Sequence, residues 1–168
     1  MSVSNPTDLS LIQHKDDDET FARETDSLEF LGETQTHLTA LFPASSANYV
    51  TFTAGGVANT HGAWAELVDD AANKLSDAFA TSPGHVSGIL LEDLSVKDKR
   101  YLFELAYGDD KTVILRHRFL SGDVKKLDAV LFVRIRSIVI PAGELIYYRM
   151  MCETAGATCE ISFRYHVH

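Results

Sequence analysis

The sequence predicts an all-β protein: an antiparallel, jelly-roll-like β-sandwich with an extended acidic N-terminal arm. From Asn48 onward, apolar and polar residues alternate with a period of two in short segments, as is typical of strands buried on one face. The connections between these segments are short and rich in glycine, aspartate and serine. Acidic residues crowd before that point, and this asymmetry predicts the arm.

Chain-level properties fit one folded domain with an appendage. The chain has 168 residues, of which 45% are apolar and 23% charged, ordinary values for a globular protein. No run approaches the roughly 18 apolar residues of a membrane span, so we expect no membrane partner. The N-terminus shows no basic stretch followed by an apolar core, so we expect synthesis and folding in a cytosol.

The acidic arm is predicted to cover residues 1–47 and the sandwich domain residues 48–168. Nine acids and two bases precede residue 48, whereas the whole chain has a net charge of −9. Pro43 and the small polar residues after it mark the boundary. Two interpretations of the arm stay open: a solvated, partly disordered tail, or an arm that becomes ordered on another protein surface.

The first elements are a strand, a tight turn and a second strand. "NYVTFTA" (48–54) alternates polar and apolar residues, and the glycine-rich turn that follows leads to "GAWAELV" (62–68). This turn contains His61, which we interpret as a turn residue and not as a catalytic base. Trp64 is the only tryptophan, and we expect it to fill the core. "DDAANKLSDAFATSPG" (69–84) has helical spacing for one or two turns.

The remaining segments are all predicted to be strands joined by short connections. They are "HVSGILLED" (85–93), "RYLFELAYG" (100–108), "KTVILRHRFL" (111–120), "DAVLFVRIRSIVI" (128–140), "ELIYYRMMCET" (144–154) and "ATCEISFRYHV" (157–167). The last two are expected to form a hairpin that turns at Ala155 and Gly156. That register would place Cys152 opposite Cys159, where a disulfide is geometrically feasible. The alternative is two small buried residues with reduced thiols.

Several side chains on the polar faces of these strands are candidates for contacts between subunits. Tyr147 and Met151 share the outer face of one strand with an arginine. The arginine candidates are Arg116, Arg118, Arg134, Arg136, Arg149 and Arg164. If their strands are neighbours, they form a basic stripe that docks an acidic partner; otherwise each pairs with a local carboxylate. Nucleic acid is not expected, because the chain has no positive net charge.

No motif of an enzyme, metal site or cofactor site is present. His166 and His168 share one side of the last strand, but no carboxylate or cysteine is spaced to complete a metal site with them and His117. The sequence contains no nucleophile elbow, zinc-protease motif or glycine-rich nucleotide loop. We therefore expect no enzymatic activity, no catalytic residue and no cofactor.

Three stretches resemble virion structural proteins of tailed bacteriophages. They are "ANTHGAWAEL" (58–67), "YGDDKTVILRHRFL" (107–120) and "IVIPAGELIYYRMMCETAGATCEISFRYH" (138–166). The resemblance implies a β-sandwich that works by assembly in the virion, as a capsid decoration protein or as part of a neck or tail ring. It implies partners that are copies of the chain itself, in a trimer or ring, and other virion proteins.

A binding module is the alternative function. β-sandwiches bind sugars or receptors through exposed aromatic side chains, and Tyr147, Tyr148 and Tyr165 are the candidates. This alternative requires the three rings to be exposed together on one surface.

Overall fold

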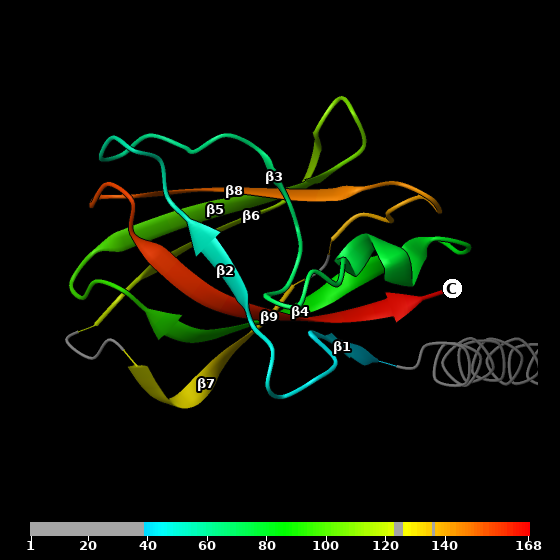
Figure 1. Cartoon of the computed structure of the whole chain (residues 1–168), viewed down its shortest axis with the longest axis horizontal. Coiled ribbons are helices and arrows are strands. Elements are labelled where there is room, and N and C mark those ends of the chain that lie inside the picture. Colours follow the sequence, from blue (N-terminus) through cyan, green and yellow to red (C-terminus); the bar gives the residue numbers. More distant parts are fainter. Residues whose placement is uncertain (1–38, 123–125, 136) are drawn as a thin grey trace, which may run out of the picture. The chain divides into compact units, whose positions relative to one another are not determined.

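The computed structural model describes residues 39–122, 126–135 and 137–168, and for residues 126–132 the backbone only (Figure 1). Residues 1–38 of the predicted arm and the candidate Arg136 lie outside the described residues. The predicted domain boundary after residue 47 stays a prediction. One short strand, β1 (Ala40–Phe42), lies on its N-terminal side and pairs with the last strand of the sandwich.

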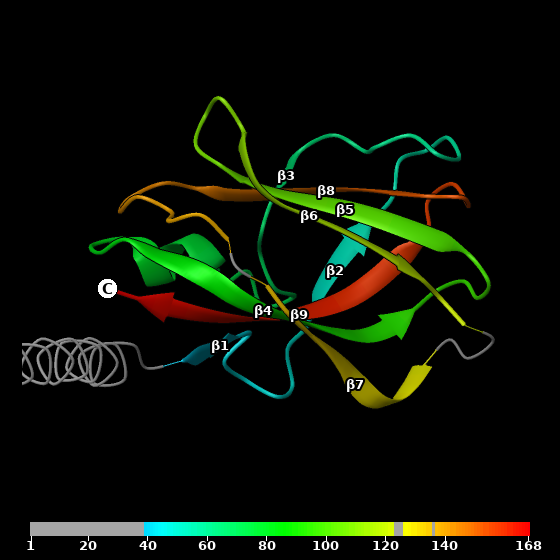
Figure 2. The same ribbon diagram turned by 180° about the vertical axis from the view of Figure 1, so that it is seen from behind.

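The described residues form two antiparallel sheets, as the sequence predicts (Figures 1 and 2). Sheet A has the order β1-β9-β4-β7, and β2 also pairs with β9. Sheet B has the order β3-β8-β5-β6. The strands of sheet A after β1 are β2 (Val50–Thr53), β4 (Gly84–Leu94), β7 (Lys126–Arg134) and β9 (Thr158–Val167). Those of sheet B are β3 (Ala65–Glu66), β5 (Arg100–Tyr107), β6 (Thr112–Leu120) and β8 (Ile146–Cys152).

The core lies between the two sheets and is built from the side chains that point inward at alternate positions along the strands. Phe52 of β2 and Phe163 of β9 come from sheet A, and Phe103 of β5 comes from sheet B; all three are fully buried. The ring centroid of Phe52 lies 5.4 Å from that of Phe103 and 5.9 Å from that of Phe163. Burying such large aromatic surfaces is the main favourable term for a sandwich of this size.

The segment with helical spacing forms one short 3-10 helix, η1 (Leu75–Phe79). Its Leu75 and Phe79 are buried against the core, which explains why the spacing is apolar. In the part of the chain that the structure describes, no helix has the length and apolar character that a membrane crossing needs.

The predicted hairpin between the last two strands is wrong. β8 belongs to sheet B and β9 to sheet A, so the connection between them crosses from one sheet to the other. A turn does lie at Ala155 and Gly156, but it connects the two sheets. The backbone after β2 bonds to it: Gly156 donates a hydrogen bond to the Gly55 carbonyl, and Ala54 donates one to the Ala157 carbonyl.

The two cysteines are therefore not cross-strand partners. Cys152 lies opposite Tyr101 on β5, and Cys159 lies opposite Phe52 and Leu94 in sheet A. Both thiols are free and buried. Burial raises the pKa of Cys159, which keeps its thiol protonated and unreactive. The disulfide considered from the sequence is thus replaced by two small core residues.

The prediction that Trp64 fills the core is also wrong. Trp64 is half-buried directly before β3, and the fully buried side chain of this region is Leu67, directly after β3. The guanidinium of Arg149 lies 4.4 Å from the centroid of the Trp64 ring, on the outer side of sheet B. The tight turn requires glycine at position 55, because a Cβ there would lie 2.5 Å from the Thr60 carbonyl oxygen.

Candidate interaction surface on sheet B

The outward face of sheet B gathers charged and aromatic side chains from all four of its strands or their flanks. We call it the outer face of sheet B and define it by the following residues: Trp64, Arg100, Leu102, Glu104, Arg116, Arg118, Leu120, Tyr147, Arg149, Met151 and Glu153. They alternate with the inward residues of β5, β6 and β8. Five of the predicted interface residues lie here: Arg116, Arg118, Tyr147, Arg149 and Met151.

A network around Glu104 occupies the centre of this face. The Glu104 side chain is 4% exposed and accepts hydrogen bonds from Nε of Arg116 (2.5 Å) and Nε of Arg149 (2.7 Å). The register places these three residues directly opposite one another on β6, β5 and β8. Burial opposes the ionisation of Glu104, but the hydrogen bonds and charges of both arginines outweigh it and lower its pKa.

Trp64 extends the network across the edge of the sheet. Its ring stacks under the Arg149 guanidinium, so one arginine joins a carboxylate to an indole. The pKa of the nearby His61 is lowered, mainly by burial of the ring and next by the positive charge of Arg149. Its buried Nε2 has no hydrogen-bond partner among the described residues. The lowered pKa favours the neutral form of His61 near the arginines. Its interpretation as a turn residue stays a prediction.

A second row of contacts crosses the same face towards the tip of the β5–β6 hairpin. The ammonium of Lys111 lies 3.4 Å from the centroid of the Tyr147 ring. Tyr147 is paired in register with Glu66 of β3, whose carboxylate forms a 3.0 Å ion pair with Lys74. Both rows thus combine a cation with an aromatic ring, a composition that protein–protein interfaces favour.

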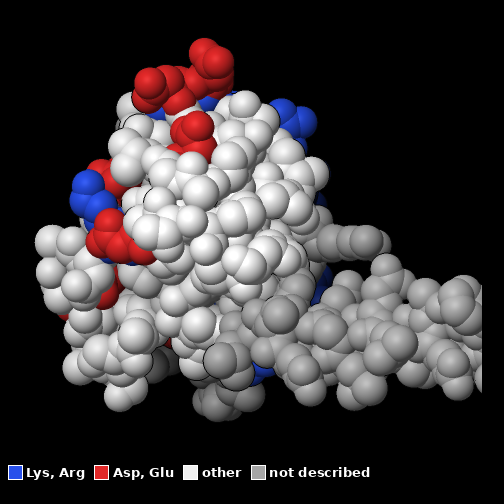
Figure 3. Space-filling model, turned by 90° about the vertical axis from the view of Figure 1, so that its right-hand side faces the viewer, with Lys and Arg blue, Asp and Glu red and all other residues white. Residues whose placement is uncertain are grey.

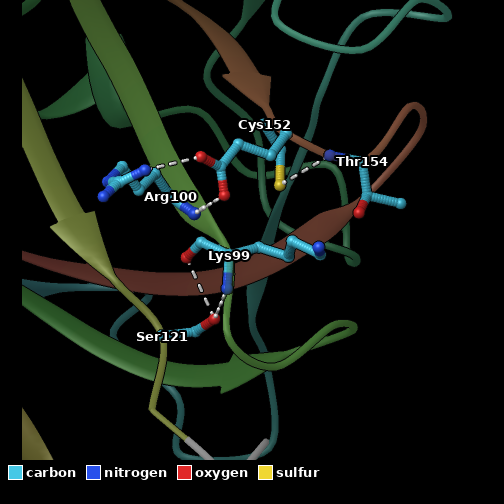
Figure 4. A network of polar contacts seen from close by, with 6 residues as sticks. Lys99, Arg100, Ser121, Cys152 and Thr154 are labelled. Atoms are coloured by element: carbon cyan, nitrogen blue, oxygen red, sulfur yellow. Dashed lines mark hydrogen bonds and ion pairs between the residues drawn. The ribbon is translucent and has the colours of Figure 1, made fainter.

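The opposite end of the face is hollowed into a shallow cavity of about 160 Å³. Residues that line it include Asn59, Arg100, Leu102, Arg118 and Met151. Arg100 is held by Glu153 through a 2.9 Å ion pair, which Figure 4 shows with the neighbouring contacts. The hydrogen bonds from Arg100 lower the pKa of Glu153. The Ser121 hydroxyl donates to the Lys99 carbonyl and accepts from the Lys99 amide, which fixes the start of β5 to the end of β6 (Figure 4).

The five candidate arginines that the structure describes do not form the single basic stripe considered from the sequence. Arg134 on β7 and Arg164 on β9 flank Gly88 in sheet A, whereas Arg116, Arg118 and Arg149 lie on sheet B. The arginines therefore face two sides of the sandwich. The period of two places each arginine on an outward face, but it carries no information about which sheet the strand joins.

The tyrosines of the alternative binding module do not share one surface. The Tyr148 ring points inward and stacks on Phe52 at 3.8 Å, and its hydroxyl donates to the Thr51 carbonyl. The Tyr165 ring packs against Phe79 at 5.5 Å. Because Tyr147 lies on the outer face of sheet B, the condition that the three rings be exposed together is not met, and the sugar-binding alternative loses its support.

His117 lies apart from His166 and His168, so the three histidines considered from the sequence do not form one site. His117 points inward, where its ring lies between Phe103 and Phe119. His166 stacks on His85 with centroids 5.0 Å apart, and His85 Nδ1 lies 3.0 Å from Nε2 of His168. Among the described residues, no group of three metal-binding side chains is arranged to hold an ion.

A different surface closes the end of the sandwich where the η1–β4 connection and the C-terminus lie. Figure 3 shows that the centre of this end carries neither acidic nor basic residues, and that acidic residues gather at its upper edge. Ile138 and Val139 are 53% and 54% exposed, next to the bridge between Gly84 and Ile140.

Sequence reasoning missed Glu104, Asn59 and the outward position of Trp64. Glu104 carried a usable signal, because a lone carboxylate between Phe103 and Leu105 in an apolar strand requires a cationic partner when it is buried. Asn59 and Trp64 lie in an irregular segment, where periodicity does not show the direction of a side chain.

No protein-family model matches the chain, and no curated protein matches it in sequence. Solved structures with a weak likeness include those titled infectious bursal disease virus VP2 subviral particle (TM-score 0.37, 12% identity), Gt strain (0.33, 16%) and Gx strain (0.30, 14%). The matches cover 77%, 78% and 78% of this chain and 33%, 32% and 28% of those chains. The chain therefore spans about a third of their length. With such TM-scores, this likeness carries no argument about function.

Proposed function

We propose that the chain is a virion structural protein that works by assembly, as a capsid decoration protein or a component of a neck or tail ring. The virion assignment rests on the sequence resemblance of residues 58–67, 107–120 and 138–166. The observation that supports assembly is the outer face of sheet B, where two rows of cation–aromatic contacts cross a sheet with a packed core behind it.

This face has the properties of a surface that binds protein. Arginine, tryptophan, tyrosine and methionine are enriched at protein interfaces, and Trp64, Tyr147, Arg149 and Met151 lie together here. The arginines are held by Glu104 and Trp64 before any partner arrives, so little side-chain entropy is lost on binding. Repeated by symmetry, such contacts give avidity without a deep pocket.

The mass of the full-length protein in solution tests the proposal. Trp64→Ala and Met151→Lys alter the outer face of sheet B, and Leu41→Lys is the matched control. Leu41 is 49% exposed, lies on sheet A and is paired with Arg164. We expect light scattering to show that the wild type and Leu41→Lys form the same oligomer, and that the two sheet B variants shift to smaller species. Equal oligomers for all four proteins would contradict the role of this face.

A further inference from the structure

The cavity on the outer face of sheet B has the size of a single side chain. Its volume is about 160 Å³. That equals roughly five water molecules at about 30 Å³ each, and it is below the roughly 300–1,000 Å³ of sites for drug-sized ligands. Leu102 and Met151 supply apolar surface, and Arg100, Arg118 and Asn59 supply hydrogen-bond donors. The Glu153 carboxylate also lines the cavity, where its charge is paired with that of Arg100. The cavity is therefore suited to a side chain with a short aliphatic stem and a carboxylate head.

Arg118 is the cation that such a carboxylate would meet. Arg116 and Arg149 are already paired with Glu104, and Arg100 is paired with Glu153. No carboxylate of the described residues forms an ion pair with Arg118, which lies opposite Leu102 on β5. A guanidinium binds a carboxylate through two parallel hydrogen bonds, so an arginine without an ion pair beside a cavity is a directional site for an acid.

The charge around the cavity is opposite to that of the chain. The outer face of sheet B carries four arginines against two glutamates, Glu104 and Glu153, while the whole chain has a net charge of −9. The complementary charge lies in the N-terminal segment, where Asp16, Asp17, Asp18 and Glu19 are consecutive. The chain thus carries both a basic cavity and an acidic segment.

We propose that this cavity docks the acidic segment of residues 14–33 from a second copy of the chain. The segment precedes β1, which belongs to sheet A, whereas the cavity opens on the outward face of sheet B. Exchange between copies then links the sheet A side of one subunit, where the segment joins β1, to the outer face of sheet B of the next subunit. Such a head-to-tail contact closes into a ring when the rotation permits. This inference rests on the proposed assembly role and names its contact.

A peptide of residues 14–33 tests the docking site directly. Labelled peptide is added to the full-length protein at a concentration where that protein is monomeric, and its fluorescence anisotropy is measured. We expect binding that weakens with added salt and falls by roughly tenfold or more in Arg118→Glu. Arg134→Glu makes the same charge change on sheet A and leaves the affinity unchanged. A peptide with Asn at positions 16, 17 and 18 binds more weakly. Equal affinity for the wild type and Arg118→Glu overturns the inference.

A charge swap tests whether the segment acts between copies. Full-length Arg118→Glu and a full-length chain with Asp16→Lys, Asp17→Lys and Asp18→Lys each lose self-association. We expect their mixture to associate again, because the unchanged acidic segment of the first chain meets the unchanged Arg118 of the second. The lysines introduced into the second chain likewise meet the glutamate introduced into the first. No association in the mixture overturns exchange between copies. Circular dichroism confirms that each variant keeps its strand content.

The two experiments separate this inference from the assembly role. If the wild type and Arg118→Glu assemble equally, the docking site is wrong and the assembly role stands. If the peptide binds through Arg118 but the wild type is monomeric at every concentration, the assembly role and the exchange between copies are wrong, and only the binding site for the acidic segment stands.

Discussion

Replacing Glu104 by glutamine removes the charge that holds two arginines on the outer face of sheet B, with almost no change in volume. The Glu104 side chain is 4% exposed, and those of Arg149 and Arg116 are 30% and 66% exposed. A charge-assisted hydrogen bond from a partly buried partner contributes about 1.5–3 kcal/mol, which applies to Arg149. The more exposed Arg116 adds at most about 1 kcal/mol after solvent screening. We therefore expect Glu104→Gln to lower the free energy of unfolding by about 1.5–4 kcal/mol.

Equilibrium unfolding in urea measures this change, and an unchanged m-value shows that the folded state is equally compact. Because the folded-state pKa of Glu104 lies below its ordinary value of 4.5, its stabilisation is complete above pH 4.5 and is lost as the pH falls through the lowered pKa. The difference between wild type and variant should therefore shrink in acid. A difference below about 0.5 kcal/mol at neutral pH, the range of ordinary surface substitutions, would refute this account of the network.

Three substitutions outside the Glu104 network test the positions of individual residues in the core and in the glycine-rich turn. Leu67→Ala lowers the free energy of unfolding by about 2–5 kcal/mol, because Leu67 is fully buried. Trp64→Ala lowers it less, because Trp64 is half-buried. Urea unfolding that shows the reverse order would contradict this. His117→Leu makes the free energy of unfolding less sensitive to acid. Burial lowers the pKa of His117 below 6.5, so the neutral ring stabilises the folded state above that pH. This stabilisation is lost as the pH falls through the lowered pKa. Unfolding measured across this pH range shows the effect, and an unchanged pH profile would exclude it. Gly55→Ala lowers the melting temperature, because the added Cβ would lie 2.5 Å from the Thr60 carbonyl oxygen. Gly62→Ala leaves it nearly unchanged, because there the nearest atom, the Thr53 carbonyl oxygen, is 3.5 Å away. Equal melting temperatures for the two variants would contradict this difference.

The alternation of residues predicted the faces of strands well. In β9, Cys159, Ile161 and Phe163 are buried as the period of two requires, and in β8 Ile146, Met150 and Cys152 are buried while Tyr147 and Met151 face outward. Alternation follows from the geometry of a single strand, so the local sequence is sufficient to predict it.

The partners of strands could not be predicted in the same way. β8 and β9 are neighbours in sequence, yet the segment after β2 bonds to the Gly156 amide and the Ala157 carbonyl, and the two strands join different sheets. Pairing depends on contacts between distant segments, which a local pattern does not contain. The same limit explains why the arginines were assigned to one stripe, although Arg134 and Arg118 lie on different sheets.

We propose that copies of this chain assemble through the outer face of sheet B. Hydroxyl-radical footprinting of the assembled and dissociated protein tests it most directly, because it reports the solvent exposure of individual side chains. We predict that Trp64 and Met151 lose reactivity on assembly, while Tyr49, which is 41% exposed and paired with Asp70 away from this face, keeps its reactivity. Unchanged reactivity of Trp64 and Met151 in the assembled protein would contradict the claim.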